Sequence, residues 1–314
     1  MKPLPKTLAF YAIGDEVTPS TRFRVLPFIE SLRNSGWQIK KYTLPNLKGG
    51  RFFGVLELFW QGILRFFQLL EAPAYEIVVI QKGLTPARFR CLVDFFLKRN
   101  IPYLYDFDDS VYVEAPILLP KAVRWLQEEQ EPVRLIQKAS SIVAGNSHLA
   151  KHVRQKLDRN CTVVPTPIDT DEYFPQPDNK AGEKKVIGWS GSASTNAYVN
   201  LIFPVLQKLG QKHSFDFLAI SSDLRDIRLP PNPNFGFKFI PWNPESAARD
   251  LRKMTLGIMP MTEDEWARGK CGIKALLYMS VGLPVVVSPI GVNREIVEHG
   301  KNGFWADSEE EYLS

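Results

Sequence analysis

Residues 185–195 read KVIGWSGSAST and repeat the pattern with which the chain opens. In both places a short apolar run ends at a glycine and a polar loop follows, as in LAFYAIGDE at residues 8–16. Short apolar runs alternate with helical stretches between these two openings and again after the second. Some runs, such as IVVI at residues 77–80, are apolar throughout, as strands covered on both faces must be. This alternation predicts two doubly wound α/β domains with parallel sheets.

The two domains are expected to be Rossmann-like and to face each other across a cleft. A proline-rich stretch at residues 165–177 and the polar spacer DNKAGEKK separate them, which gives predicted domains of residues 1–168 and 169–314. Strands are expected at residues 7–14, 39–44, 77–82, 102–109, 140–146, 161–167, 186–191, 215–222, 237–242, 256–261 and 284–289. In such a pair of domains the ligand lies at the carboxyl ends of the sheets.

The composition fits this organisation. A chain of 314 residues suits two domains of roughly 150 residues each. Its net charge of +5 suits anionic small molecules or an anionic membrane surface, and no sequence motif favours nucleic acid as a partner. The three cysteines are widely separated, which argues against a disulfide framework or a zinc site and favours a reducing cytosol. The first apolar run is expected to be a strand and not a signal peptide.

Three stretches of the chain carry a resemblance to a known family. They are KCGIKALLYMSVGLPVVVSPIGVNRE at residues 270–295, SIVAGNSHLAKHV with VVPTPIDTDEYFP between residues 141 and 175, and PSTRFRVLPFIESLRNSGW at residues 19–37 with YDFDDSVY at residues 105–112. Together they resemble the retaining GT-B glycosyltransferases of family 4, or glycosyl transferases group 1. This large family is typified by sucrose and glycogen synthases and by bacterial polysaccharide enzymes.

The resemblance implies a GT-B fold and a hexosyltransferase that uses a UDP- or GDP-sugar with retention. It also implies a glycan or lipid-linked acceptor, a place in polysaccharide biosynthesis, and no metal cofactor. The family usually ends in further helices, so the natural chain is expected to continue beyond Ser314. Two alternatives are a nucleotide-sugar epimerase of the same shape and a non-catalytic subunit that binds nucleotide sugars.

The sequence departs from the family pattern in its charged residues. The family's pair of glutamates corresponds here to Gly269 and Leu277, and the usual basic residues are absent from the loop at residues 188–195. Lys270 and Lys274 lie four positions apart at the start of a predicted helix and share one face. We therefore expect these two lysines to stabilise the charge of the departing diphosphate, as catalytic residues. A solvated basic face is the alternative.

The other predicted donor contacts surround these lysines. Gly191 and Ser192 follow a strand, where backbone N–H groups can approach a phosphate, although an ordinary capped turn would have the same residues. The remaining predicted donor-binding residues lie near the start of the helix that carries Lys274 and in the glycine loop at residues 291–295. They are Arg268, Gly272, Gly291, Val292, Asn293 and Glu295. The resemblance implies that Glu295 contacts hydroxyls of the donor sugar or ribose. A glutamate favoured by the dipole at a helix start is the alternative.

The first domain is expected to bind the acceptor through Gly14, Arg22, Arg24 and Asp108, with Asp109 as a catalytic residue. Both arginines begin a helix after the first strand, where they would hold a phosphate-bearing acceptor or lie on the surface. Asp106 and Asp108 have the DxD spacing with which single-domain glycosyltransferases bind Mg²⁺ or Mn²⁺. The second opening at residue 185 argues against that fold, so no metal is expected.

Residues 52–70, FFGVLELFWQGILRFFQLL, form the most apolar stretch of the chain. The polar positions, Glu57, Gln61, Arg65 and Gln68, recur every three to four residues and mark one face of a helix. Burial of the apolar arc against the sheet is one interpretation. A helix lying on a membrane surface is the other, and it predicts a cytoplasmic protein that is peripheral on the membrane's inner face.

Overall fold

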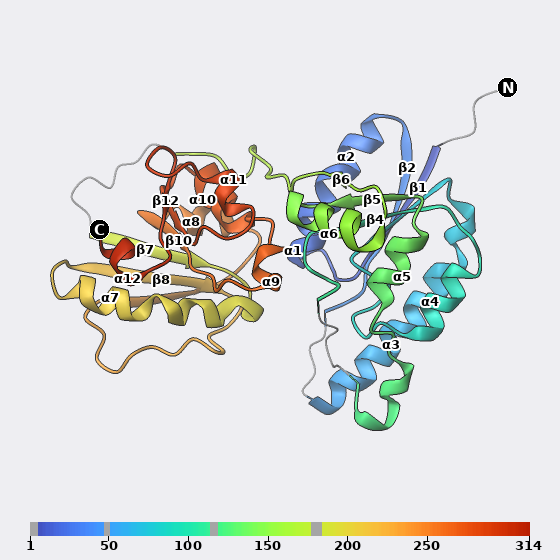
Figure 1. The fold of residues 1–314 in the computed structure, drawn as a ribbon, viewed down its shortest axis with the longest axis horizontal. Helices are drawn as coiled ribbons and strands as arrows, with labels where there is room; N and C mark the ends of the chain where they lie inside the picture. The colour runs from blue at the N-terminus through green and yellow to red at the C-terminus, as the bar shows by residue number, and fades with distance from the viewer. Residues whose placement is uncertain (1–5, 47–50, 114–118, 177–183) are drawn as a thin grey trace. The chain divides into compact units, whose positions relative to one another are not determined.

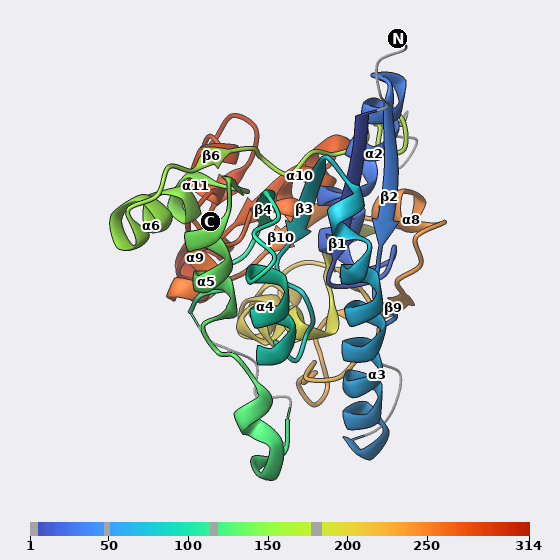
Figure 2. The ribbon, with the colours of Figure 1, turned by 90° about the vertical axis from the view of Figure 1, so that its right-hand side faces the viewer.

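The computed structural model describes residues 6–46, 51–113, 119–176 and 184–314. The chain divides into two compact units, residues 1–167 and 168–314, and the boundary lies one residue from the predicted one. Each unit is built on a six-stranded sheet whose strands are all parallel. The predicted fold class is confirmed: both units are Rossmann-like α/β layers (Figures 1 and 2).

Unit 1 has the strand order β2-β1-β3-β4-β5-β6. The strands are β1 (Lys6–Ala12), β2 (Trp37–Tyr42), β3 (Ile77–Gln81), β4 (Tyr103–Phe107), β5 (Ser141–Ala144) and β6 (Thr162–Val163). The helices are α1 (Pro19–Arg24), α2 (Leu26–Asn34), α3 (Arg51–Leu70), η1 (Ala72–Ala74), α4 (Arg90–Leu97), η2 (Lys121–Leu126), α5 (Glu131–Lys138) and α6 (Ser147–Leu157). The helical stretch after β1 is divided into α1 and α2, because Pro27 has no N–H to donate.

Helices cover both faces of the first sheet. Residues of α2 such as Ile29 pack with Phe10 and Val79 on one face. On the other face, Tyr11 stacks on Tyr42, and its hydroxyl donates to the carbonyl of Gln68 in α3. The alternation of side chains along β1 therefore places α2 and α3 on opposite sides.

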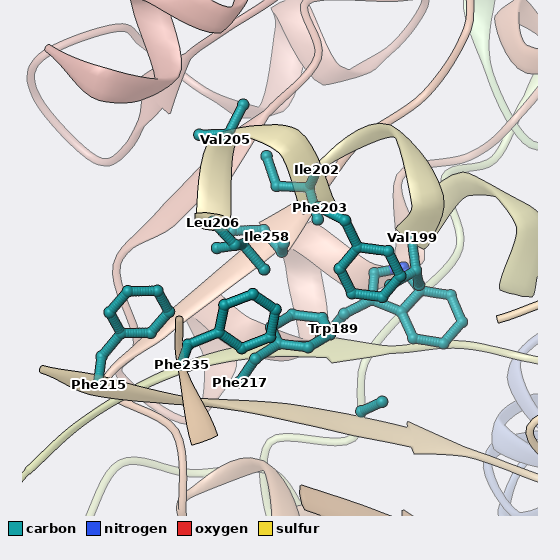
Figure 3. Packing of buried hydrophobic residues seen from close by; sticks show 11 residues of the cluster. Trp189, Val199, Ile202, Phe203, Val205, Leu206, Phe215, Phe217, Phe235 and Ile258 are labelled. Atoms are coloured by element: carbon teal, nitrogen blue, oxygen red, sulfur yellow. The ribbon is translucent and has the colours of Figure 1, made fainter. Parts of the chain in front are cut away.

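Unit 2 has the strand order β12-β11-β10-β7-β8-β9. Its strands are β7 (Lys185–Ser190), β8 (Phe215–Ser221), β9 (Gly236–Pro241), β10 (Leu256–Met259), β11 (Val285–Val287) and β12 (Phe304–Trp305). Its helices are η3 (Ala193–Leu201), α7 (Phe203–Gly210), α8 (Ala247–Leu251), α9 (Glu265–Arg268), α10 (Ile273–Ser280), α11 (Asn293–Ile296) and α12 (Glu309–Leu313). The core under α7 is aromatic, with Trp189, Phe203 and Phe217 packed together (Figure 3).

The apolar arc of α3 does not pack against the sheet, so that interpretation of the sequence is wrong. Gln61 and Arg65 are buried instead, while Trp60 and Phe67 are mostly exposed. Phe52 and Phe53 lie outside the residues whose side chains are described. Among the described residues, no helix combines the length and the apolar character needed to cross a membrane.

Candidate active site

Lys274 connects two elements of unit 2 at the carboxyl end of β7. It lies in the first turn of α10, and its Nζ is 3.2 Å from Oγ1 of Thr195 in η3. The same Nζ is 4.7 Å from the ring centroid of Trp189, a fully buried residue near the end of β7. The cation thus rests on an indole and a hydroxyl, which are both neutral groups.

Among the described residues, no carboxylate forms an ion pair with Lys274. Burial, and to a smaller extent repulsion from Lys270, lowers its pKa to about 7. A nearby anion would stabilise a partly buried ammonium in this position. The site therefore favours an anionic ligand.

Tyr278 fixes the orientation of α10 one turn after Lys274. Its hydroxyl accepts the N–H of Ser190 at 2.7 Å, which joins the helix to the last residue of β7. Its ring lies against β10 at Gly257, where a Cβ would be 2.4 Å from the Tyr278 Cγ. Glycine at 257 is therefore needed for the close approach of helix and sheet.

The predicted glycine loop packs against the loop before α10. Gly291 has a φ of +54°, and a Cβ there would lie 2.6 Å from the Arg268 carbonyl oxygen. Gly272 has a φ of +67°, and its Cβ would lie 2.3 Å from Cδ1 of Ile296 and 3.2 Å from Cγ1 of Val292. The structure thus brings four of the predicted donor residues, Arg268, Gly272, Gly291 and Val292, into one region beside Lys274.

Asn293 has a structural position in this loop. Its side chain is buried, and its Nδ2 donates to the carbonyl of Ser288 at 3.0 Å. The hydrogen bond holds the end of β11 against the start of α11. This geometry favours an anchoring role for Asn293 over the predicted donor contact.

The remaining charged residues near α10 are more accessible. Lys270 is half-buried, with its Nζ 4.4 Å from the ring centroid of Trp266. Arg268 is exposed and pairs with Glu263 at 2.5 Å, and Glu295 is exposed on α11. These side chains border the region around Lys274, where solvent and ligands can reach them.

The predicted phosphate turn lies directly beside the same lysine. The N–H of Gly191 donates to the carbonyl of Ile220 at 2.9 Å, so the sheet uses this donor. A Cβ at Gly191 would be 2.4 Å from the Trp189 ring and 2.7 Å from Oγ1 of Thr195. Ser192 accepts the N–H of Thr195 at 2.8 Å and starts η3. Glycine at 191 is needed for packing on Trp189, and Ser192 shapes the turn next to Lys274.

Arg24 in unit 1 is buried, unlike an acceptor-binding residue. Its Nε donates to Oδ2 of Asp106 at 3.1 Å, and its Nη2 pairs with the other carboxylate oxygen. Its Nη1 donates to the carbonyl of Val164 at 2.5 Å. These bonds join α1 to β4 and to the residue after β6. They favour a structural role for Arg24 over the predicted contact with the acceptor.

Asp108 and Asp109 follow β4 and share Lys82 as a partner. The Lys82 Nζ is 3.1 Å from Asp108 and 3.4 Å from Asp109, and the Ser20 hydroxyl donates to Asp108 at 3.2 Å. Burial opposes the ionised form of Asp108, but Lys82, Arg24 and the Ser20 hydroxyl together outweigh it and hold the pKa of this carboxyl below its ordinary value. Asp106 pairs with Arg24, so all three carboxylates of this segment have a cation as partner.

Two other predicted acceptor residues lie where the chain turns from β1 into α1. The carbonyl of Gly14 accepts the hydroxyl of Thr21 at 3.1 Å, and a Cβ at Gly14 would be 2.3 Å from Oγ1 of Thr18. Arg22 is half-buried, with its guanidinium 4.4 Å from the ring centroid of Phe23. Gly14 therefore has a packing role in this turn, and Arg22 stays the better candidate for a ligand contact.

Lys82 and Tyr278 were not predicted from the sequence, and Trp189 and Thr195 were predicted only as part of the phosphate turn. Lys82 has a φ of +65°, which is rare for a residue other than glycine and aims its side chain at the two aspartates. A lysine directly after a buried strand was a signal that could have identified it. The other three residues resemble ordinary strand and helix residues, and only their contacts with Lys274 or β7 distinguish them.

The comparisons with known proteins concern the sequence of unit 2 and the fold of the chain. Residues 184–313 match the model of the family Glycosyl transferases group 1. The matched residues include Lys270, Lys274 and the glycine loop. No curated protein matches the chain in sequence.

Solved glycosyltransferase structures match the chain over nearly its whole length and show that it has the GT-B fold. A sucrose-phosphate synthase of Thermosynechococcus elongatus has a TM-score of 0.64 at 12% identity, covering 98% of this chain and 88% of its own. The Anabaena protein HepE, in complex with UDP and glucose, has a TM-score of 0.58 at 16% identity with the same coverage. The catalytic domain of Arabidopsis thaliana starch synthase IV, bound to ADP and acarbose, has a TM-score of 0.67 at 10% identity, covering 98% and 90%.

Proposed function

We propose that the chain is a glycosyltransferase that moves a hexosyl group from a UDP- or GDP-sugar to a glycan or lipid-linked acceptor. The observation that carries the proposal is Lys274, a partly buried cation on neutral partners beside a strand end. In this proposal the donor diphosphate is the missing anion. The glycosyl transferases group 1 domain around the lysine and the GT-B fold support this assignment.

The reaction mainly requires stabilisation of the negative charge that develops on the departing diphosphate. Lys274 would lie close to a phosphoryl oxygen, and Lys270 would approach from the solvent side. A fixed cation in a partly desolvated site stabilises this charge more than water does. Because the diphosphate favours the protonated amine, donor binding would raise the pKa of Lys274 from about 7.

The acceptor would be bound by unit 1, at the carboxyl edge of its sheet. There Lys82 holds Asp108 and Asp109 in place, and Asp109 is the residue that we propose to act near the acceptor hydroxyl. We propose retention, in which a donor phosphate oxygen helps to deprotonate the acceptor on the same face of the sugar. The proposed reaction needs no metal, since lysines stabilise the leaving group. It belongs to polysaccharide biosynthesis at the cytoplasmic face of a membrane.

Binding and turnover test the proposal separately. The melting temperature should rise with one nucleoside diphosphate and its sugar, in a screen of UDP, GDP and ADP with their sugars, because a ligand of the folded state stabilises it. Release of the diphosphate should then depend on an added glycan or lipid-linked acceptor. Turnover without acceptor to an isomeric sugar would indicate an epimerase. Binding without turnover would indicate a non-catalytic subunit, and no binding would overturn the proposal.

A further inference from the structure

The helix α3 has its polar side buried and its apolar side exposed. Leu58, Gln61, Arg65 and Leu69 form the buried side. The opposite side carries an apolar stripe at helical spacing, with exposed fractions of 55% for Leu56, 61% for Trp60, 51% for Ile63, 60% for Phe67 and 43% for Leu70. Isolated exposed apolar residues are ordinary, but a continuous row along one helix marks an interaction surface.

Buried hydrogen bonds explain this reversed polarity. Arg65 donates to the carbonyls of Ala12 and Leu84 at 2.5 and 2.8 Å, and Gln61 donates to the carbonyl of Pro45 at 2.6 Å. These carbonyls follow or end β1, β3 and β2, so the helix is bound to the sheet edge by polar groups. The apolar stripe consequently stays exposed among the described residues of unit 1.

Basic and aromatic residues accompany the stripe. Phe66 contacts Phe95 of α4 at 4.8 Å between ring centroids, and the Arg99 guanidinium lies 4.3 Å from the centroid of Phe95. Lys98 is exposed next to Arg99. In the first half of α3, the ring of Phe59 contacts the ring of Phe89. Phe89 in turn forms a β-bridge with Gln127, the residue after η2, so α3 is joined to η2.

That segment adds a second exposed aromatic residue. Trp125 of η2 is 71% exposed, and Lys121, on the same short helix, is also exposed. In both views of the ribbon, α3 and the green segment of residues 119–130, which includes η2, extend toward the same end of unit 1 (Figures 1 and 2). Apolar anchors with cations beside them are the pattern of a surface that meets an anionic bilayer.

We propose that the stripe of α3, with Trp125 as a second anchor, binds the surface of an anionic lipid bilayer. The helix would lie in the plane of the interface, with the stripe among the acyl chains and Lys98, Arg99 and Lys121 at the headgroups. A second copy of the chain fits less well, because a symmetric contact through this surface would bring like charges together.

The position of the α3 stripe in unit 1 gives it a role in acceptor binding. This role rests on the proposed function. Leu84, whose carbonyl binds Arg65, is two residues from Lys82, the partner of Asp108 and Asp109. Bilayer binding by α3 would therefore hold the carboxyl edge of the first sheet close to the lipid. A lipid-linked acceptor at the membrane would reach this edge without leaving the bilayer.

Co-sedimentation with vesicles tests the inference. The wild-type chain should bind vesicles of phosphatidylcholine and phosphatidylglycerol, and should bind less to phosphatidylcholine alone or at high salt. The double variant Trp60→Ser, Phe67→Ser should bind at least about tenfold more weakly, since two apolar anchors are lost. The matched control is Leu224→Ser, Leu229→Ser in unit 2, which changes two exposed leucines and should bind as wild type does.

Melting temperature and size-exclusion chromatography complete the test. The stripe variant should keep its melting temperature, because both side chains are exposed. Equal vesicle binding by the folded stripe variant, or no binding by wild type, would overturn the inference. A wild-type dimer that the stripe variant converts to a monomer would overturn it in favour of self-association. Donor binding, measured on the same proteins without lipid, tests the proposed function independently.

Discussion

The ammonium of Lys274 lies 4.7 Å above the ring of Trp189, and the indole is completely buried. This relationship makes the lysine a fixed charge, because the ring and the Thr195 hydroxyl determine its position before any ligand binds. A preorganised cation of this kind needs no rearrangement when negative charge develops on a leaving group. The first two predictions depend on it.

Replacing either lysine of α10 should reduce sugar transfer without unfolding the protein. Lys270→Ala and Lys274→Ala each remove a cation from the developing charge, which typically costs about 2–4 kcal/mol, or roughly 30- to 1000-fold in kcat/KM. Nucleoside diphosphate affinity should fall as well, while nucleoside affinity should hardly change. The exposed Lys301, replaced by alanine, is the control. Donor kinetics of both variants within about twofold of wild type would remove the lysines from the site.

The pH dependence of ligand binding should report the titration of Lys274. Its pKa is lowered from an ordinary 10.5 to about 7, so the free protein loses this proton as the pH rises through neutrality. Diphosphate affinity should therefore weaken between pH 7 and 9, and this weakening should be smaller in Lys274→Met. Calorimetric titration with UDP or GDP at several pH values measures it. An unchanged pH profile in the variant would assign the titration to another group.

The stability of the free protein should show the opposite sign for the same group. Between the folded pKa of about 7 and the unfolded value of 10.5, the unfolded chain binds the proton more strongly. The contribution of Lys274 to the free energy of unfolding thus rises with pH across this window. Urea unfolding of wild type and Lys274→Met at pH 7 and 9 should show a smaller rise in the variant. A parallel rise in both proteins would contradict the lowered pKa.

Removing Arg24 should cost stability more than catalysis. Arg24→Ala leaves the buried Asp106 carboxylate without its cation, a change that costs about 3–5 kcal/mol of unfolding free energy. The double variant Arg24→Met, Asp106→Leu should recover part of this loss, because neither charge of the pair is left buried at this position. Arg33→Ala, on the exposed surface of α2, is the control. An Arg24→Ala protein of wild-type stability with poor acceptor affinity would restore the acceptor role predicted from sequence.

Alanine substitutions at two glycines with positive φ distinguish the effect of a steric clash from the effect of backbone strain. Gly291→Ala would place a Cβ 2.6 Å from the Arg268 carbonyl oxygen, whereas Gly300→Ala meets nothing within 4 Å. Both variants should lose about 1 kcal/mol from backbone strain. The Gly291 variant should also show a raised KM for the donor, because the loops around Lys274 are pushed apart. Equal donor kinetics in the two variants would show that this contact is not needed for donor binding.

The strands and the carboxyl-edge location of the site could be predicted from the sequence, because buried parallel strands have long apolar runs and end in recognisable loops. Lys274 was predicted because it lies four residues after Lys270, beside a glycine and at the start of an apolar helix, and its role stays a prediction. The pair of Arg24 and Asp106 was not predicted, because its members are 82 residues apart in sequence. An arginine at a helix start has the same local pattern whether it is buried or exposed. The two-residue strand β12 was missed because it is too short to have a period.

The periodicity of α3 predicted a helix with a polar and an apolar side. One of its two interpretations, burial of the apolar side against the sheet, was wrong. A hydrophobic pattern shows which residues share a face, and the usual assumption is that the apolar face is inside. The carbonyls at the ends of three strands reverse this assumption here, because they need donors and Gln61 and Arg65 provide them. No local signal in residues 51–70 shows that these carbonyls lie beside the helix.

The reversed helix also has a consequence for laboratory work with this protein. An exposed apolar surface promotes aggregation during overexpression. A redesign based on the helical wheel would make the apolar side of the helix polar and the polar side apolar. Applied to α3, that redesign would place apolar side chains at Gln61 and Arg65 and leave the strand-end carbonyls without donors. Mild detergent or small lipid discs, which cover Trp60 and Phe67 and leave the buried bonds intact, are the better choice for purification.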